Sequence, residues 1–86
     1  MATLSLLYFA RVREAIGLDG EAVDVPADVT TVADLAAWLA ARGSGYADAF
    51  ADLTRLRAAI DDRFVALDAP IAGAREVALF PPVTGG

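Results

Sequence analysis

The chain has 86 residues and a formal net charge of −5, and 57% of its residues are hydrophobic against 22% charged. A chain of this length supports a single hydrophobic core, and so apolar a composition excludes a disordered protein. It contains no Cys, His or Lys, which excludes disulfides, thiolate and imidazole chemistry and Schiff-base catalysis. A self-contained enzyme is therefore not expected.

The charge and the apolar pattern also limit the partners. Phosphate binding requires a clustered positive surface, so a net acidic chain is not expected to bind nucleic acid. Its seven basic residues, all Arg, are spread along the chain with acidic residues near most of them. An acidic domain instead suits a basic protein partner, although the charge could equally serve only to keep the protein soluble. Apolar runs are too short for a membrane span, and no targeting signal is recognisable, so we expect a cytoplasmic location without a membrane partner.

The first third of the chain predicts a strand, a short helix and a second strand. Residues 3–9 form a short apolar run with partial alternation, which is typical of a strand with at least one buried face. Residues 10–16 read as a short helix that Gly17 ends. Residues 21–25 alternate polar and apolar side chains until Pro26, as expected for a half-buried strand.

The best predicted helix begins near Thr31. Thr31 and Asp34 have the spacing of a capping box, in which the hydroxyl accepts a backbone N–H and the carboxylate lies in the first turn. Apolar residues at i, i+3, i+4 and i+7 build one stripe on this helix, formed by Val32, Leu35, Ala36 and Leu39. Gly43-Ser44-Gly45 is predicted to end the helix. Trp38 lies off the centre of the stripe, and we expect it to pack at the edge of the core.

The remaining segments are short. Residues 47–53 predict one or two helical turns with Phe50 and Leu53 facing inward. Three strands follow, predicted at residues 57–60, 64–67 and 76–80. Residues 61–63 suit a tight turn, and we interpret the adjacent Asp61 and Asp62 as turn residues rather than as metal ligands or general acids. This order of elements predicts an α+β fold, in which a mixed sheet packs on one main helix.

The chemistry of this chain is predicted to concentrate in its last six residues. Residues 1–80 are expected to form the domain, and residues 81–86 a flexible tail. Pro81 and Pro82 have no N–H to donate to a sheet and hold the chain extended, so the six residues could reach about 20 Å. Gly85 and Gly86 lack side chains and could pass through a narrow channel of a partner enzyme. The terminal carboxylate would then be the working group, but it needs activation by another enzyme, because this chain has no phosphate-binding loop.

Three segments resemble one known family. Residues 79–86, Leu-Phe-Pro-Pro-Val-Thr-Gly-Gly, are similar to the C-terminal signature of the small subunits of molybdopterin synthase, a family of ubiquitin-like sulfur carriers. Residues 8–14 resemble the first strand and helix of that family, and residues 31–35 resemble the start of its main helix. The family often has Gly-Asp-Glu before the last strand, where this chain has Ala74-Arg75-Glu76 after Gly73. That departure affects a turn and leaves the tail unchanged.

The resemblance implies a ubiquitin-like β-grasp fold and a specific chemistry. An ATP-using activating enzyme would adenylate Gly86, and a sulfur-transfer enzyme would convert the adenylate to a thiocarboxylate. The thiocarboxylate would donate sulfur to cyclic pyranopterin monophosphate on the large subunit, within a heterotetramer that makes the molybdenum cofactor. The chain itself would bind no cofactor and no metal. Besides Gly86, the residues expected to contact partners are Phe9, Phe80, Pro81, Pro82, Val83, Thr84 and Gly85.

Some alternatives stay open from the sequence. Phe9 and Phe80 could instead be ordinary core residues, because aromatic side chains serve both roles. The carrier could serve thiamine or another thiolated product. It could also be a protein modifier joined to lysines of other proteins, although without Lys it cannot build side-chain-linked chains of itself. A binding module with an inert tail is the third alternative.

Overall fold

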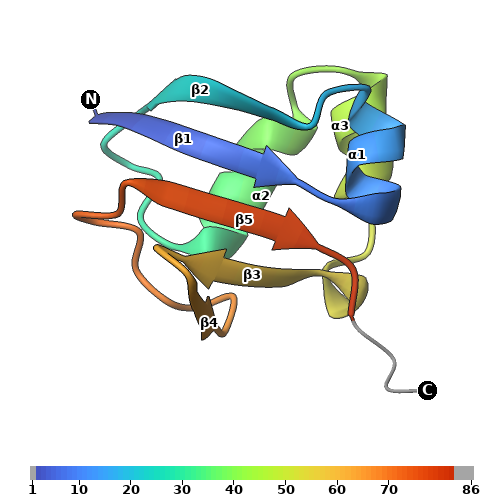
Figure 1. Cartoon of the computed structure of the whole chain (residues 1–86). Helices are drawn as coiled ribbons and strands as arrows, with labels where there is room; N and C mark the ends of the chain where they lie inside the picture. Colours follow the sequence, from blue (N-terminus) through green and yellow to red (C-terminus); the bar gives the residue numbers. More distant parts are fainter. Residues whose placement is uncertain (1, 83–86) are drawn as a thin grey trace.

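The computed structural model describes residues 2–82 (Figure 1). A five-stranded mixed sheet has the strand order β2-β1-β5-β3-β4, with β1 and β5 parallel at its centre and the other neighbours antiparallel. The elements are β1 (Ala2–Tyr8), α1 (Ala10–Ile16), β2 (Gly20–Val25), α2 (Val32–Ala40), α3 (Ser44–Ala49), the 3₁₀ helix η1 (Leu53–Arg55), β3 (Arg57–Ile60), β4 (Arg63–Val65) and β5 (Glu76–Phe80). No helix within residues 2–82 is long and apolar enough to cross a membrane. The predicted α+β architecture is confirmed.

One face of the sheet and the stripe of α2 form the core. The stripe of Val32, Leu35, Ala36 and Leu39 is fully shielded from solvent, as predicted. Alternate strand residues meet it from the sheet, namely Leu4, Leu6, Tyr8, Val23, Val25, Ala58, Val77 and Leu79. Figure 1 shows α2 behind the sheet. We call the face of the sheet that packs against α2 the covered face, and the opposite face the open face. Trp38 is partly buried at the margin of the core, which confirms its predicted place.

The start of α2 is fixed by the predicted capping box. The hydroxyl of Thr31 accepts the N–H of Asp34 at 3.1 Å, and the carboxylate of Asp34 accepts the N–H of Thr31 at 3.3 Å. Thr30 adds two further bonds to the same carboxylate, from its N–H and its hydroxyl. These bonds favour the ionised form and lower the pKa of Asp34. The helix therefore begins where local chemistry predicts.

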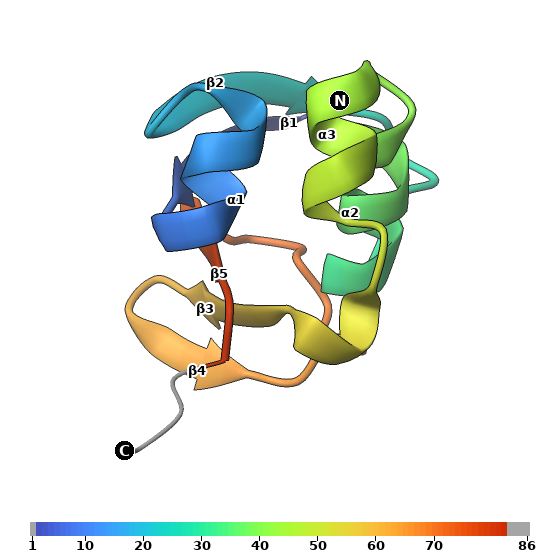
Figure 2. The same ribbon diagram turned by 90° about the vertical axis from the view of Figure 1, so that its right-hand side faces the viewer.

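The glycines after α2 have a different role from the one predicted. α2 already ends at Ala40, and Ser44 begins α3, so the predicted helical turns start earlier in the chain than expected. A Cβ at Gly45 would lie 2.6 Å from the carbonyl oxygen of Ala15, so this glycine permits the close approach of α1 and α3. Figure 2 shows these two helices side by side at one end of the sheet. Phe50 is buried and Leu53 packs against the core, so their predicted inward direction is confirmed.

β3 and β4 are joined by a turn that is one residue shorter than predicted. Ile60 pairs with Arg63, and Asp61 and Asp62 between them have φ values of 47° and 71°. Two left-handed residues are what a tight hairpin turn matching the twist of the strands requires. The carboxylate of Asp61 also accepts the N–H groups of Arg75 and Glu76, at 3.1 and 2.9 Å, and so fixes the start of β5. β4 accordingly spans Arg63–Val65 rather than the predicted residues 64–67.

Candidate functional site

The candidate site is the edge of the sheet at which β1 and β5 both end. Because these strands are parallel neighbours, with Tyr8 beside Leu79, the residues that follow them emerge at the same edge. The N–H of Phe9 donates to the carbonyl oxygen of Leu79 at 3.2 Å and continues the pairing by one step. β5 ends at Phe80, where the prolines were predicted to end it. Figure 1 shows β1 and β5 ending next to each other at this edge, on the side where α1 lies.

The structure places four of the predicted partner-binding residues together at this edge. Phe9 is 45% exposed, which contradicts the alternative that it is an ordinary core residue. Phe80, Pro81 and Pro82 are half-buried. Phe80 shares the open face with Ala78, since Val77 and Leu79 face the core. The other predicted residues, Val83, Thr84, Gly85 and Gly86, lie outside the described residues.

The open face next to this edge carries an apolar patch. The patch consists of Leu7, Ala59, Phe64, Ala78 and Phe80. Four of its members form one row across the sheet, because the register pairs Leu7 with Ala78, Ala78 with Ala59, and Ala59 with Phe64. The ring of Phe64 contacts that of Phe80 edge-on, with centroids 5.8 Å apart. No helix of residues 2–82 covers this face, so the patch is open to a partner (Figure 1).

Phe64 is the member of this patch that sequence reasoning missed. Its side chain is 85% exposed, the highest value among the large hydrophobic residues that the structure describes. Burying a phenylalanine stabilises a protein by about 1.5–3 kcal/mol, so leaving it in water forgoes that gain. A signal for this position existed, because Val65 and Leu67 pack against the core and Phe64 alternates with them. An aromatic residue out of phase with a buried pattern indicates a contact surface.

A charged depression lies on the other side of the tail root, which we define as Phe80, Pro81 and Pro82. Pro81 lines it together with residues of α1, α3 and the η1 region: Arg11, Val12, Asp48, Ala49, Ala51, Asp52 and Arg55. Asp52 accepts the N–H and the hydroxyl of Thr54, and these bonds lower the pKa of its carboxyl group. The tail root thus lies at a border between the apolar patch and a surface with charges of both signs.

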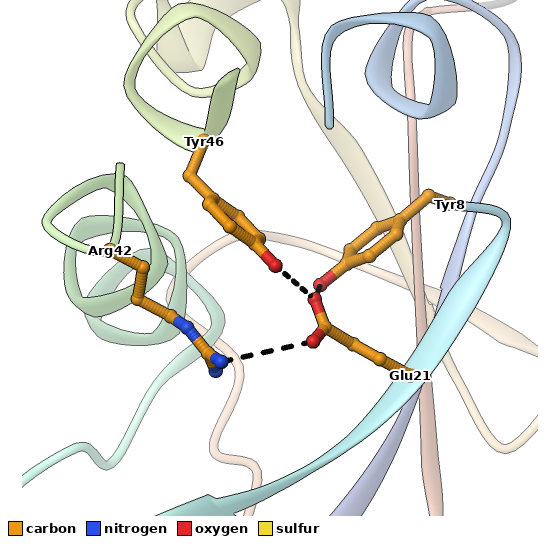
Figure 3. Close-up of polar contacts among 4 residues, drawn as sticks. All are labelled: Tyr8, Glu21, Arg42 and Tyr46. Carbon is orange, nitrogen blue, oxygen red and sulfur yellow. Dashed lines mark hydrogen bonds and ion pairs between the residues drawn. The ribbon is translucent and has the colours of Figure 1, made fainter. Parts of the chain in front are cut away.

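A second cluster of polar side chains lies at the rim of the covered face (Figure 3). One carboxylate oxygen of Glu21 accepts hydrogen bonds from the hydroxyls of Tyr8 and Tyr46, at 2.8 and 2.7 Å. The guanidinium of Arg42 lies 3.8 Å from the other oxygen, and its central carbon lies over the rings of Trp38 and Tyr46, 5.4 Å from each centroid. Burial, together with the bond to Glu21, raises the pKa of Tyr8, and the bond to Glu21 raises that of Tyr46.

This cluster ties three elements together and has the properties of a structural link. Glu21 lies on β2, Tyr8 at the end of β1, and Tyr46 on α3. Their hydrogen-bonding groups are occupied by one another, so the arrangement holds α3 on the sheet rather than presenting a free acid or base. Within residues 2–82 no group of three or more Asp, Glu, His or Cys could hold a metal ion.

Comparisons with known proteins agree with this geometry. The family described as the ThiS family matches residues 6–86. The chain is 43% identical to the molybdopterin synthase sulfur carrier subunit of Escherichia coli K12 and 36% identical to that of Haemophilus influenzae Rd. Each match covers 96% of this chain and 99% of the relative. The crystal structure of SAMP1 from Haloferax volcanii is 26% identical with a TM-score of 0.70, and the match covers 99% of this chain and all of that one. The expected ubiquitin-like β-grasp fold is confirmed.

Proposed function

We propose that this chain, which belongs to the ThiS family, is the sulfur-carrier subunit of a molybdopterin synthase. Two relatives matched over nearly their whole length carry that name. The observation that carries the proposal is the placement of the tail root. β5 delivers Phe80 to an edge of the sheet beside an uncovered apolar patch, and the sequence that follows ends in Gly85-Gly86.

The proposed chemistry uses the carboxylate of Gly86. An activating enzyme transfers AMP from ATP to this carboxylate and releases pyrophosphate, because a free carboxylate is a poor electrophile. A sulfur-transfer enzyme then supplies sulfur at the sulfide oxidation level, which displaces AMP from the acyl carbon and gives a thiocarboxylate. The sulfur of this group forms a bond to cyclic pyranopterin monophosphate, water cleaves the acyl–sulfur bond, and the carrier returns with a carboxylate. The domain's contribution is to tether the sulfur nucleophile at a defined place, which raises its effective concentration at the acceptor.

The proposed partner is the large subunit of the synthase, which holds the acceptor. The relatives are named as subunits, and a heterotetramer with two carriers fits a product that receives two sulfur atoms. We assign the docking surface to the apolar patch and Phe9, since exposed aromatic residues concentrate the binding energy of interfaces. The chain binds no cofactor in this proposal, and its net charge of −5 attracts a partner whose site is basic. The reaction takes place in the cytoplasm.

The deciding experiment is an intact-mass measurement of the protein isolated from its own cells. The proposal expects a population heavier by one oxygen-to-sulfur exchange, located at Gly86 by fragmentation. Deletion of Gly86 is expected to abolish that population and cofactor synthesis, while the melting temperature stays the same because the residue belongs to the predicted tail, residues 81–86. An extension by one residue after Gly86 serves as the matched variant and is expected to have the same effect.

Two results would contradict the proposal. Full cofactor synthesis by the extended variant would mean that the tail is inert and that the domain acts only by binding. Higher-mass adducts on denaturing gels, without any thiocarboxylate, would instead identify a protein modifier.

A further inference from the structure

The junction between β1 and α1 contains a strained residue beside the tail root. Ala10 has a φ of 51°, in the left-handed region that residues other than glycine rarely adopt. Among the described residues only Asp61 and Asp62 share this property outside glycine. Those two form a hairpin turn that requires left-handed residues, and Asp tolerates the conformation through local hydrogen bonds. Ala10 does not lie in a hairpin turn, and its side chain cannot form such hydrogen bonds.

The strain at Ala10 arises because the backbone of Phe9 takes part in both the sheet and the start of α1. The N–H of Phe9 extends the sheet by donating to Leu79 at 3.2 Å, while its carbonyl oxygen begins α1 by accepting Val12 and Arg13 at 3.1 and 3.3 Å. Its backbone stays extended, with φ −129° and ψ 155°. The change of direction from strand to helix therefore falls on the next residue. The side chain of Ala10 is exposed, so packing does not account for its presence there.

The two ends of α1 make a useful contrast. Gly17 ends the helix with a φ of 88°, and a Cβ at this position would meet nothing within 4 Å. The chain thus uses glycine at the end of α1 where only a change of direction is needed. At the end beside the tail root, alanine occupies the position that requires a left-handed φ. Alanine permits far fewer backbone angles than glycine.

We infer that Ala10 is a positioning residue, whose restricted left-handed backbone holds the half-exposed ring of Phe9 at a fixed place beside the tail root for docking of the large subunit. This inference rests on the proposed function for the identity of the partner. Phe9 is 45% exposed, and the N–H bond to Leu79 places it next to Phe80. A residue whose backbone is already fixed before binding loses less conformational entropy on binding, so the stiff junction favours association. Backbone strain that the rest of a fold sustains at such a place is typical of binding sites.

The test replaces Ala10 with glycine, which relieves the strain and loosens the junction. We expect the melting temperature of Ala10→Gly to rise by about 3 °C, because the strain is removed from the folded state. We expect the affinity for purified molybdopterin synthase large subunit to fall by about 3- to 10-fold, because Phe9 must now be ordered on binding. The amide of Phe9 is expected to exchange with solvent about 5-fold faster. If Ala10 had only a structural role, its replacement would not raise the melting temperature of the protein and weaken its affinity for the large subunit at the same time.

Gly17→Ala is the matched control, since it introduces at the far end of α1 the strain that Ala10→Gly removes. We expect it to lower the melting temperature and to leave the affinity of the folded protein and the exchange of the Phe9 amide unchanged. Wild-type affinity of Ala10→Gly would overturn the inference whatever the exchange rate of the Phe9 amide, as would a lower melting temperature, which would show that Ala10 is not strained. If the wild-type chain does not bind the large subunit, the proposed function fails. Faster exchange of the Phe9 amide would then still support the stiff junction, and unchanged exchange would overturn it.

Discussion

The covered and open faces of the sheet carry side chains from the same strands, but those side chains differ in their burial and in their role. On the covered face the side chains of Leu6, Val77 and Leu79 are at most 1% exposed and pack against α2. Even the carboxylate of Glu21 at its rim accepts hydrogen bonds from two phenols. On the open face Phe64 is 85% exposed and has one aromatic neighbour, Phe80. The covered face therefore stabilises the domain, whereas the open face keeps apolar area available.

This difference shows that alternation along a strand can separate stability from function within a few residues. Ala78 and Leu79 are adjacent on β5, but one belongs to the apolar patch and the other to the core. Substitutions on the covered face should change the free energy of unfolding, and those on the open face should change association. The predictions below test that separation.

The largest expected effect is that of Leu35→Asp on the covered face. Leu35 is fully buried in the middle of the α2 stripe, so the variant would place an unpaired charge in the core. The expected cost exceeds about 4 kcal/mol and is comparable to the whole stability of so small a domain, which lies toward the low end of about 5–15 kcal/mol. Circular dichroism should show an unfolded chain at 25 °C, whereas the control Leu35→Met should lose less than about 1.5 kcal/mol. Cooperative melting of a soluble Leu35→Asp would contradict the assigned packing of α2.

An intermediate effect is expected from Glu21→Ala at the rim of the same face. The substitution leaves the hydroxyl of Tyr8, a residue that is 1% exposed, without its acceptor. We expect a loss of about 2–4 kcal/mol in denaturant titrations. Glu21→Gln, which keeps an acceptor oxygen at the same place, should lose clearly less. Equal losses in both variants would mean that the charge, rather than the two hydrogen bonds, carries the interaction.

The same cluster predicts how stability depends on alkaline pH. The pKa values of Tyr8 and Tyr46 are raised above the ordinary value of 10.0, so the folded state binds these protons more tightly than the unfolded state. The resulting stability is fully present below pH 10 and is lost progressively as the pH rises above it. In Glu21→Ala the loss should be shallower, because the bond that contributes to both shifts is gone. Melting curves between about pH 8 and about pH 11 measure this slope.

The sequence predicted those elements that are formed by interactions between residues close together in the chain. The capping box of Thr31 and Asp34 and the α2 stripe depend on residues within two turns of one another, and both are confirmed. The role of Gly45 could not be predicted, because the atom that requires a glycine there belongs to Ala15, thirty residues earlier. The same holds for Glu21, whose partners lie 13, 21 and 25 residues away in the chain.

At the candidate site, the sequence predicted the tail root and Phe9 but not the apolar patch. The prolines mark the end of β5 in the sequence itself, so the place of the tail root at the end of this strand could be predicted without a structure. Four members of the patch form a row across four strands, and they come together only through the strand order and register. An alternation argument finds Phe64 as an outward residue, but it cannot show that Phe80 is the ring beside it.

The smallest effect on stability, and the most informative one, is expected from Phe64→Ser on the open face. The side chain is so exposed that its removal should change the free energy of unfolding by less than about 1 kcal/mol, mainly through the lost contact with Phe80. Affinity for the molybdopterin synthase large subunit should nevertheless fall by about 10- to 100-fold, as for an aromatic hot spot, measured by titration calorimetry.

Leu18→Ser is the control for this prediction. Leu18 is also apolar and 44% exposed, but it precedes β2, the edge strand opposite β4, and is not part of the patch. Its replacement should leave the affinity within about 2-fold of wild type, as for most residues outside the centre of an interface. Equal losses in the two variants would show that general surface hydrophobicity drives association. A Phe64→Ser variant that binds normally but unfolds easily would show that Phe64 stabilises the domain, and the open face would then lose its assigned role.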